Sequence, residues 1–183
     1  MRISYAARST YNFSLEDKLV CDAIRTRRGL TGLLPLDHAL LHSVPIASGW
    51  NELFSAIRQK TTLSSDILFL AICRVALHCG ASIPWKNYLE SLRQLDGVTN
   101  DIIEIVEDPQ PAVQGVLSDK QWAALRYADI MTKQVAVNDS VFQLVKAAGF
   151  TERQIVELTI TIAAYACVSR FLLALDIDEK EGV

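Results

Sequence analysis

Two long apolar segments constrain the fold of this chain more than any other feature. They cover residues 64–79 and 151–175, and each follows a polar residue suited to begin a helix. A helix that is apolar on nearly every face is buried, either in a protein core or in a membrane. Residues 155–175 of the second segment also hold Glu157 and Arg170, with Thr159, Thr161 and Ser169 between them, which favours a protein core. We therefore expect these two helices to form the centre of the molecule.

Helical spacing of apolar residues dominates the rest of the sequence as well, and the alternation typical of strands is almost absent. Ser118 and Thr151 are each followed three residues later by a glutamine, which is a capping box that opens a helix. Gly80 stands where a helix ends with a left-handed residue. The spacing predicts an all-α, compact multi-helix domain of eight or nine helices. Besides the two central ones, they are expected at residues 14–28, 36–42, 50–60, 84–95, 101–106, 118–134 and 140–148.

Length and composition fit one soluble domain. The chain has 183 residues, half of them hydrophobic, with a net charge of −3. This length supports one hydrophobic core, so we predict a single domain over residues 1–183 with its core at about 25–178. The N-terminal residues lack the apolar stretch of a secretory signal, and a nucleic-acid partner would need a basic face. The expectation is a cytoplasmic protein with no nucleic-acid or membrane partner.

One short basic cluster interrupts this acidic balance. It consists of Arg25, Arg27 and Arg28, at the end of the first expected helix. Such a run is more often a solvated helix end than a phosphate-binding site. Both interpretations are compatible with the sequence.

The four cysteines give no sign of a metal or disulfide framework. None forms a Cys-x-x-Cys pair, and no His/Cys spacing matches a zinc site, so we predict no metal. Cys21, Cys73 and Cys167 are expected to be small core residues. Cys79, beside His78 and before Gly80, is open to both a packing and a reactive role.

Polar and aromatic side chains gather where the first apolar helix ends. Arg74, His78 and Cys79 lie in its last turns, and Trp85 and Tyr88 follow on the next helix. Ligand pockets often lie between helices. We therefore treat this region as a candidate site.

Each polar candidate also has a structural interpretation. Arg74 and Arg170 either bind an anion or pair with a buried carboxylate such as Glu157, because a lone buried arginine is costly. His78 can instead satisfy the C-terminus of its helix. Tyr88 is either a packed phenol or a catalytic acid.

Two further aromatic positions and one histidine complete the candidates. Trp50 and Trp85 are either core residues or walls of a substrate pocket. His42, which precedes Pro45, is either a packed loop histidine or a general base.

Four stretches of the sequence resemble the carboxymuconolactone decarboxylase-like proteins, a group that includes alkyl hydroperoxidase D. Together they span about residues 25–178. The resemblance implies an all-α fold of the alkyl hydroperoxidase D-like type that assembles into trimers or hexamers. The stretches are PLDHALLHS at 35–43 with GW at 49–50; residues 63–80 with Trp85 and GV at 97–98; LSDKQ at 117–121 with YADIMT at 127–132; and IVELT at 155–159 with AY at 164–165 and VSRF at 168–171.

The sequence departs from this family at its usual site. The family pattern has a glutamate in the first central helix, a Glu-Trp pair after it and a histidine three residues past that tryptophan. The matching positions here are Phe69, Pro84, Trp85 and Tyr88, so only the tryptophan remains. The asparagine that many relatives carry in the last helix is replaced by Ala166, and the Cys-x-x-Cys of peroxidatic members is absent. The resemblance therefore implies a more apolar pocket, suited to a larger apolar substrate.

The leading hypothesis is a cofactor-independent lyase or isomerase that acts on a small hydrophobic biosynthetic metabolite. Decarboxylation, dehydration, isomerisation and cyclisation, including pericyclic ring closure, all fit a shaped pocket. The alternatives are a catalytically inactive relative that serves as a binding or assembly subunit, and a thiol-dependent antioxidant that uses Cys79. The predicted catalytic residues are Tyr88 as acid and His42 or His78 as base; the predicted substrate-binding residues are Trp85, Trp50, Phe69, Cys79 and, as anion anchors, Arg74 and Arg170.

Overall fold

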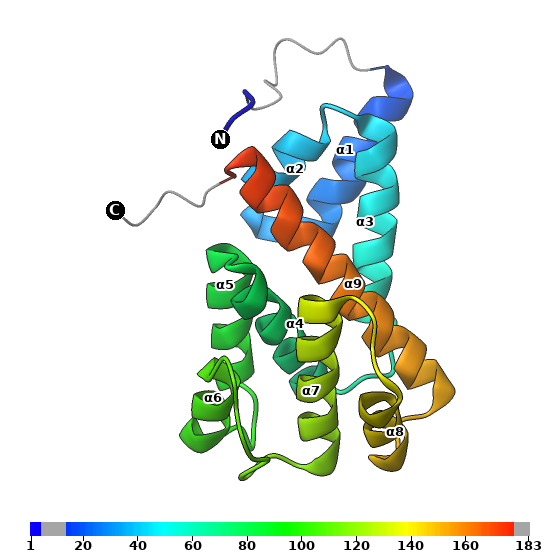
Figure 1. Cartoon of the computed structure of the whole chain (residues 1–183). Coiled ribbons are helices and arrows are strands. Elements are labelled where there is room, and N and C mark those ends of the chain that lie inside the picture. Colours follow the sequence, from blue (N-terminus) through cyan, green and yellow to red (C-terminus); the bar gives the residue numbers. More distant parts are fainter. Residues whose placement is uncertain (5–13, 178–183) are drawn as a thin grey trace. The chain divides into compact units, whose positions relative to one another are not determined.

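The computed structural model describes residues 1–4 and 14–177, and every regular element in these ranges is helical (Figure 1). The predicted all-α fold class is confirmed. The described helices are α1 (Leu15–Arg28), the short 3₁₀ helix η1 (Gly29–Thr31), α2 (Pro35–Leu40), α3 (Val44–Gln59), α4 (Ser65–Cys79), α5 (Ser82–Arg93), α6 (Asn100–Glu107), α7 (Asp119–Gln134), α8 (Asp139–Ala147) and α9 (Glu152–Leu175).

The capping residues set the helix ends as the sequence predicts. The Ser118 hydroxyl accepts from the Gln121 backbone N–H at 3.2 Å, and the Gln121 side chain accepts from the Ser118 N–H at 2.9 Å. Thr151 and Gln154 form the same reciprocal pair before α9. Gly80 follows α4 in the left-handed conformation, with φ of 68°. Each cap satisfies backbone groups that a helix end would leave without partners.

The start of α3 differs from the prediction. The helix begins at Val44 rather than at Trp50, and Pro45 lies in its first turn. A proline is tolerated there because the first backbone N–H groups of a helix have no partner within the helix. Pro45 therefore helps to begin a helix that it was expected to precede.

The chain forms two compact units. Unit 1 contains residues 1–60 and 172–183, and unit 2 contains residues 61–171. In unit 1, α3 packs against both α1 and α2, and the buried side chains include Ile24, Phe54 and Ile57. The prediction of a single domain over residues 1–183 stays a prediction, and its segments 5–13 and 178–183 lie outside the described residues.

Helix α4 is the centre of unit 2, as its apolar sequence predicts. It makes its most extensive contacts with α5 and α7, while α6 packs on α4 and α5, and α8 packs on α7 (Figure 1). Its buried run extends from Ile67 to Ala76 with the exception of Phe69. Because α4 is enclosed, a polar side chain on it must find its partners inside the protein.

Helix α9 contributes residues to both units and, at 24 residues, is the longest helix in the described part of the chain. By length and composition alone it is able to cross a membrane, yet half of its most apolar stretch is buried inside the protein. Leu158, Ile162 and Tyr165 are at most 1% exposed. A core helix passes the same test of length and composition, and this burial is what a core helix requires.

Candidate functional site

Three aromatic rings from three helices of unit 2 meet around a pair of phenol hydroxyls. Phe69 lies on α4, Tyr88 on α5 and Tyr165 on α9. The ring centroids of Tyr88 and Tyr165 are 5.2 Å apart with the rings at 85°, and those of Phe69 and Tyr88 are 5.7 Å apart. The hydroxyls of Tyr88 and Tyr165 are hydrogen-bonded to each other. We call these three residues the aromatic cluster.

The burial of the aromatic cluster is graded. Tyr165 is 1% exposed, whereas Tyr88 and Phe69 are half-buried. A phenol both donates and accepts. In the arrangement where Tyr165 donates to Tyr88, Tyr88 keeps its own O–H for a further acceptor, and a hydroxyl that accepts one hydrogen bond is polarised as a donor in the next. The pair can therefore present one proton at the partly exposed phenol.

Trp85 lies one turn before Tyr88 on α5 and lines a shallow hollow. The hollow has a volume of about 150 Å³, below the range of about 300–1,000 Å³ that ligand pockets usually have. Trp85 is half-buried, so one part of its indole faces this opening. The other lining residues are Ala76, Leu77, Gly80, Ala81 and Ser82.

Cys79 lies at the end of α4 and is half-buried. Burial raises the pKa of its thiol, and this effect outweighs the charge of Arg170 and the hydrogen bond with Ser169, which both lower it. Cys73, deeper in the same helix, has its pKa raised to about 12 by burial. A nucleophilic cysteine needs the thiolate form, so this environment does not activate Cys79. All four cysteines are unbridged; Cys21 and Cys73 are buried as predicted, whereas Cys167 is exposed on α9, so its predicted place in the core is wrong.

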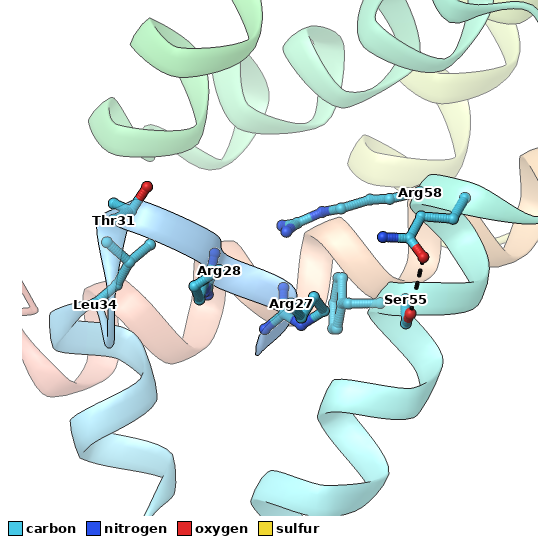
Figure 2. Close-up of a pocket in the computed structure, with 8 residues that line it drawn as sticks. Arg27, Arg28, Thr31, Leu34, Ser55 and Arg58 are labelled. Carbon is cyan, nitrogen blue, oxygen red and sulfur yellow. Dashed lines mark hydrogen bonds between the residues drawn. The ribbon is translucent and has the colours of Figure 1, made fainter. Parts of the chain in front are cut away.

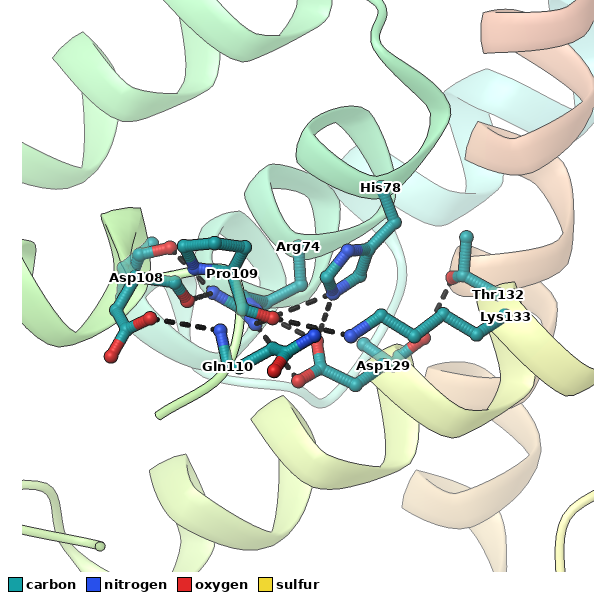
Figure 3. Close-up of polar contacts among 10 residues, drawn as sticks. Arg74, His78, Asp108, Pro109, Gln110, Asp129, Thr132 and Lys133 are labelled. Atoms are coloured by element: carbon teal, nitrogen blue, oxygen red, sulfur yellow. Dashed lines mark hydrogen bonds and ion pairs between the residues drawn. The ribbon is translucent and has the colours of Figure 1, made fainter. Parts of the chain in front are cut away.

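Arg74 is the most deeply buried charge in the described residues, with its side chain 0% exposed. Its Nε and Nη2 donate to the two carboxylate oxygens of Asp129 at 2.7 and 2.8 Å. Its Nη1 donates to the carbonyls of Val106 and Asp108 at 2.7 and 2.6 Å (Figure 3). One guanidinium thus joins α4 and α7 and closes the C-terminal end of α6, where carbonyls lack partners within the helix.

His78 belongs to the same network. Its Nε2 lies 2.8 Å from Oδ1 of Asp129 (Figure 3). Because a carboxylate only accepts, this nitrogen carries the hydrogen and donates it. Burial would raise the pKa of Asp129, but the hydrogen bonds from His78 and Arg74 and the charge of Arg74 outweigh burial and hold this pKa below its ordinary value.

The network gives both α4 residues a structural role. The sequence left open whether Arg74 anchors an anion or pairs with a carboxylate such as Glu157; the structure pairs it with Asp129. Glu157 instead accepts from the backbone and hydroxyl of Thr62, both at 2.7 Å, and from Arg153. The guanidinium of Arg74 is thus enclosed and engaged by protein groups, and its role as an anion anchor for a substrate stays a prediction.

The remaining predicted site residues are distributed between the units. In unit 1, His42 is exposed with its Nε2 2.7 Å from the carbonyl of Ser4, and Trp50 packs on Phe54 at a centroid distance of 4.7 Å. In unit 2, Arg170 is exposed on α9. Within residues 1–4 and 14–177, no three His, Cys, Asp or Glu side chains are grouped closely enough to hold a metal ion.

Two important residues were missing from the sequence-based site. Asp129 was overlooked because it lies in an amphipathic helix where an acidic residue is ordinary; a buried arginine on α4 was the signal that a carboxylate had to exist somewhere. Tyr165 is marked in the sequence only by the AY pair at 164–165, which is part of a stretch that resembles the family. A lone phenol within a long apolar helix is itself a signal, since a buried hydroxyl needs a partner.

Solved structures with the same fold are known. An uncharacterized peroxidase-related protein from Silicibacter sp. TM1040 is 15% identical with a TM-score of 0.70, and the match covers 97% of this chain and 94% of that one. The debrominase Bmp8 in its apo form is 14% identical with a TM-score of 0.73, covering 97% and 91%. A protein of unknown function from Agrobacterium tumefaciens, described as a candidate antioxidant defence protein AhpD, is 19% identical with a TM-score of 0.63, covering 74% and 89%. This chain therefore has the alkyl hydroperoxidase D-like fold that its sequence predicts.

The sequence itself has diverged far within this fold. No family model and no curated protein matches it. At identities of 13–19% the likeness shows a shared fold alone. Function must therefore be argued from the residues of this chain.

We expect Asp129→Asn to lower the free energy of unfolding by about 3 kcal/mol or more, because it leaves the Arg74 charge buried without its counter-ion. Urea unfolding at pH 7 measures this. The exposed Glu104→Gln on α6 is the control and should change stability by less than about 0.5 kcal/mol.

Since the pKa of Asp129 is lowered in the native protein, the stabilisation is present above about pH 4 and is lost as the pH falls through the native pKa. A gap between wild type and Asp129→Asn that stays constant down to pH 2 would contradict this assignment.

We expect Cys79 to be alkylated slowly at neutral pH, since burial raises the pKa of its thiol. Iodoacetamide labelling followed by peptide mass spectrometry across pH 6–10 measures this, with glutathione in the same tube as the reference thiol. The labelling midpoint of Cys79 should lie above that of glutathione. A midpoint below it would restore the thiol-dependent antioxidant hypothesis.

Proposed function

We propose that this protein is a cofactor-independent lyase or isomerase that acts on a small hydrophobic metabolite. The hydrogen-bonded pair of Tyr88 and Tyr165 carries the proposal. It supplies a phenol proton donor at the edge of an apolar cluster, at the family position where the resemblance expects a histidine. The pair offers acid chemistry without a metal or a thiolate.

Tyr88 is the proposed proton or hydrogen-bond donor. Decarboxylation, dehydration, isomerisation and cyclisation of carbonyl compounds each develop negative charge on an oxygen, and a donor placed at that oxygen stabilises the transition state. Tyr165, fixed in the core on α9, would orient Tyr88 by donating to its hydroxyl, and the half-buried Tyr88 would regain its proton from solvent. Phe69 and Trp85 would form apolar walls that hold the substrate in a reactive conformer.

The proposed base is less closely defined than the acid. His78 would have to give up its hydrogen bond to Asp129 before it accepted a substrate proton. His42 is exposed in unit 1, where its Nε2 lies 2.7 Å from the Ser4 carbonyl, and its role as base stays a prediction. A reaction driven by shape and by the Tyr88 donor needs neither histidine.

A structure with the same fold supports a ligand of this chemical class. A cysteine-to-alanine variant of Bmp8, which is 13% identical to this chain, was solved in complex with 2,3,4-tribromopyrrole. That ligand is a small, flat, apolar ring. We take it as support for a small hydrophobic ligand here, while the debromination of Bmp8 belongs to that protein.

A ligand search with native protein tests the proposal first. The purified wild-type protein is denatured, and released small molecules are identified by mass spectrometry. We expect a bound apolar metabolite in wild type that is lost in Trp85→Ala. Repeatedly empty wild-type protein of one defined oligomeric size would contradict the enzyme proposal.

The recovered compound then serves as substrate in a kinetic test. Tyr88→Phe keeps the ring and removes the hydroxyl, so we expect kcat to fall by about 10²–10⁴-fold. Tyr127→Phe is the matched control, because it also removes a hydroxyl from a bond between helices, in this case to Thr159 at 2.9 Å, and it should retain kcat within a few-fold. Full turnover in Tyr88→Phe would remove the acid role and leave catalysis by shape.

A second candidate function is a catalytically inactive binding or assembly subunit. The small volume beside Trp85 favours it, and so does an exposed apolar stripe on α9. Val156 is 67% and Ile160 41% exposed, and the exposed Ala163 and Cys167 continue the same face at helical spacing. Exposed apolar surface of this kind marks contacts with other proteins. We propose that it joins copies of this chain in a homo-oligomer, in a trimer or hexamer as the resemblance implies.

We expect Ile160→Lys to lower the molar mass measured by light scattering during gel filtration, because a charge on this stripe would be buried in the contact. The control Lys86→Glu changes an exposed charge on α5 and should leave the mass unchanged. A monomeric wild type, or an unchanged mass in Ile160→Lys, would show that the stripe does not join copies of the chain.

A further inference from the structure

The basic cluster at the end of α1 is divided by the fold into one solvated and two inward-facing arginines. Arg25 is exposed and pairs with Asp22 three residues earlier. The side chains of Arg27 and Arg28 are only 9% and 11% exposed. A solvated helix end therefore accounts for Arg25 and does not account for the other two.

Arg27 and Arg28 line a hollow of about 220 Å³ within unit 1 (Figure 2). Arg58, from the last turn of α3, lines it as well, and its guanidinium points toward the α1 side of the opening (Figure 2). Three permanently charged side chains thus meet at one small space. The other lining residues are Thr31, Leu34, Phe54, Ser55 and Gln59, so no carboxylate is among the eight.

The carboxylate of Asp37 fixes the position of the Arg28 guanidinium. This carboxylate is 1% exposed and accepts from Nε and Nη2 of Arg28 at 2.8 and 2.9 Å, and from the Leu34 backbone N–H at 2.9 Å. Nη2 of Arg27 lies 3.7 Å from the same carboxylate. Among the described residues, Nη1 of Arg28 has no hydrogen-bond partner. Nη1 therefore keeps its two N–H donors for a ligand. Because the Arg28 guanidinium is already fixed by Asp37, the entropic cost of binding is lower.

We propose that this hollow binds the phosphate group of a small phosphorylated ligand. A guanidinium presents parallel N–H donors that match phosphate oxygens. The Thr31 hydroxyl in the lining adds a neutral donor, whereas the Ser55 hydroxyl donates to Oε1 of Gln59 at 3.4 Å (Figure 2). The half-buried Leu34 gives the hollow an apolar part that suits a short carbon group attached to the phosphate, while Phe54 lines the hollow but is only 2% exposed. Several guanidinium groups attract a doubly charged phosphate with more Coulomb energy than they attract a singly charged carboxylate. The site is contained in unit 1 and is independent of the aromatic cluster in unit 2.

Isothermal titration of the full-length protein with inorganic phosphate, phenyl phosphate and acetate at constant ionic strength tests the proposal. We expect saturable binding of inorganic phosphate, tighter binding of phenyl phosphate through its apolar ring, and no measurable binding of acetate. Arg58→Gln should weaken the affinity for inorganic phosphate and for phenyl phosphate by about tenfold or more, since a charge-assisted hydrogen bond is lost. Arg58 is exposed, so this variant leaves the buried pair of Arg28 and Asp37 in place.

Arg25→Gln is the matched control, because it removes one positive charge from the same basic cluster but from outside the hollow. Its phosphate affinity should stay within about twofold of wild type, since a distant exposed charge is screened by salt. Equal losses in Arg25→Gln and Arg58→Gln would show a diffuse charge effect and overturn the site. Absence of saturable binding of either phosphate to the wild type would overturn it too, as would acetate that binds as tightly as phosphate.

Discussion

The ion pair of Arg74 and Asp129 is the constraint on which unit 2 depends. A guanidinium enclosed in the core is tolerated only when its donors are satisfied, and here the partners come from α7, from the last turn of α6 and from the loop that follows α6. Those segments must therefore lie where the arginine can reach them. Hydrophobic burial provides most of the driving force for folding, but it has no direction. The charged network has direction, and it fixes the helices around α4 in one arrangement.

The same network decides which polar groups are available for chemistry. It engages His78 as well as Arg74 at the far end of α4, so the titratable groups that the sequence places beside each other serve the fold. The aromatic cluster is organised differently. Its two phenol hydroxyls are hydrogen-bonded to each other, and the phenol of Tyr88 is half-buried. The enclosed network of Arg74, Asp129 and His78 has a structural role. The phenol pair, of which Tyr88 is half-buried, is the candidate reactive group of unit 2.

Divergence within a shared fold follows from this division. The alkyl hydroperoxidase D-like fold is shared at identities below 20%, because many different sequences can supply apolar helices and helix caps. The reactive groups are under no such structural requirement. Phe69, Pro84 and Tyr88 replace the polar residues that the resemblance expects, and they pack without leaving an unsatisfied group. The fold therefore constrains the possible chemistry of this chain only loosely.

The sequence alone predicts the helical class, the central place of α4 and most helix ends, because apolar spacing and capping are local properties that act within a few residues. It also singled out Tyr88, Trp85 and Arg74. It could not supply Asp129 or Tyr165, which lie 55 and 77 residues from the side chains they contact, since nothing local distinguishes them from ordinary helix residues. It likewise could not separate Arg25 from Arg27 and Arg28. Which of these arginines face solvent and which line the hollow depends on how α2 and α3 pack around the end of α1. This packing is a tertiary property and is not visible in the local sequence.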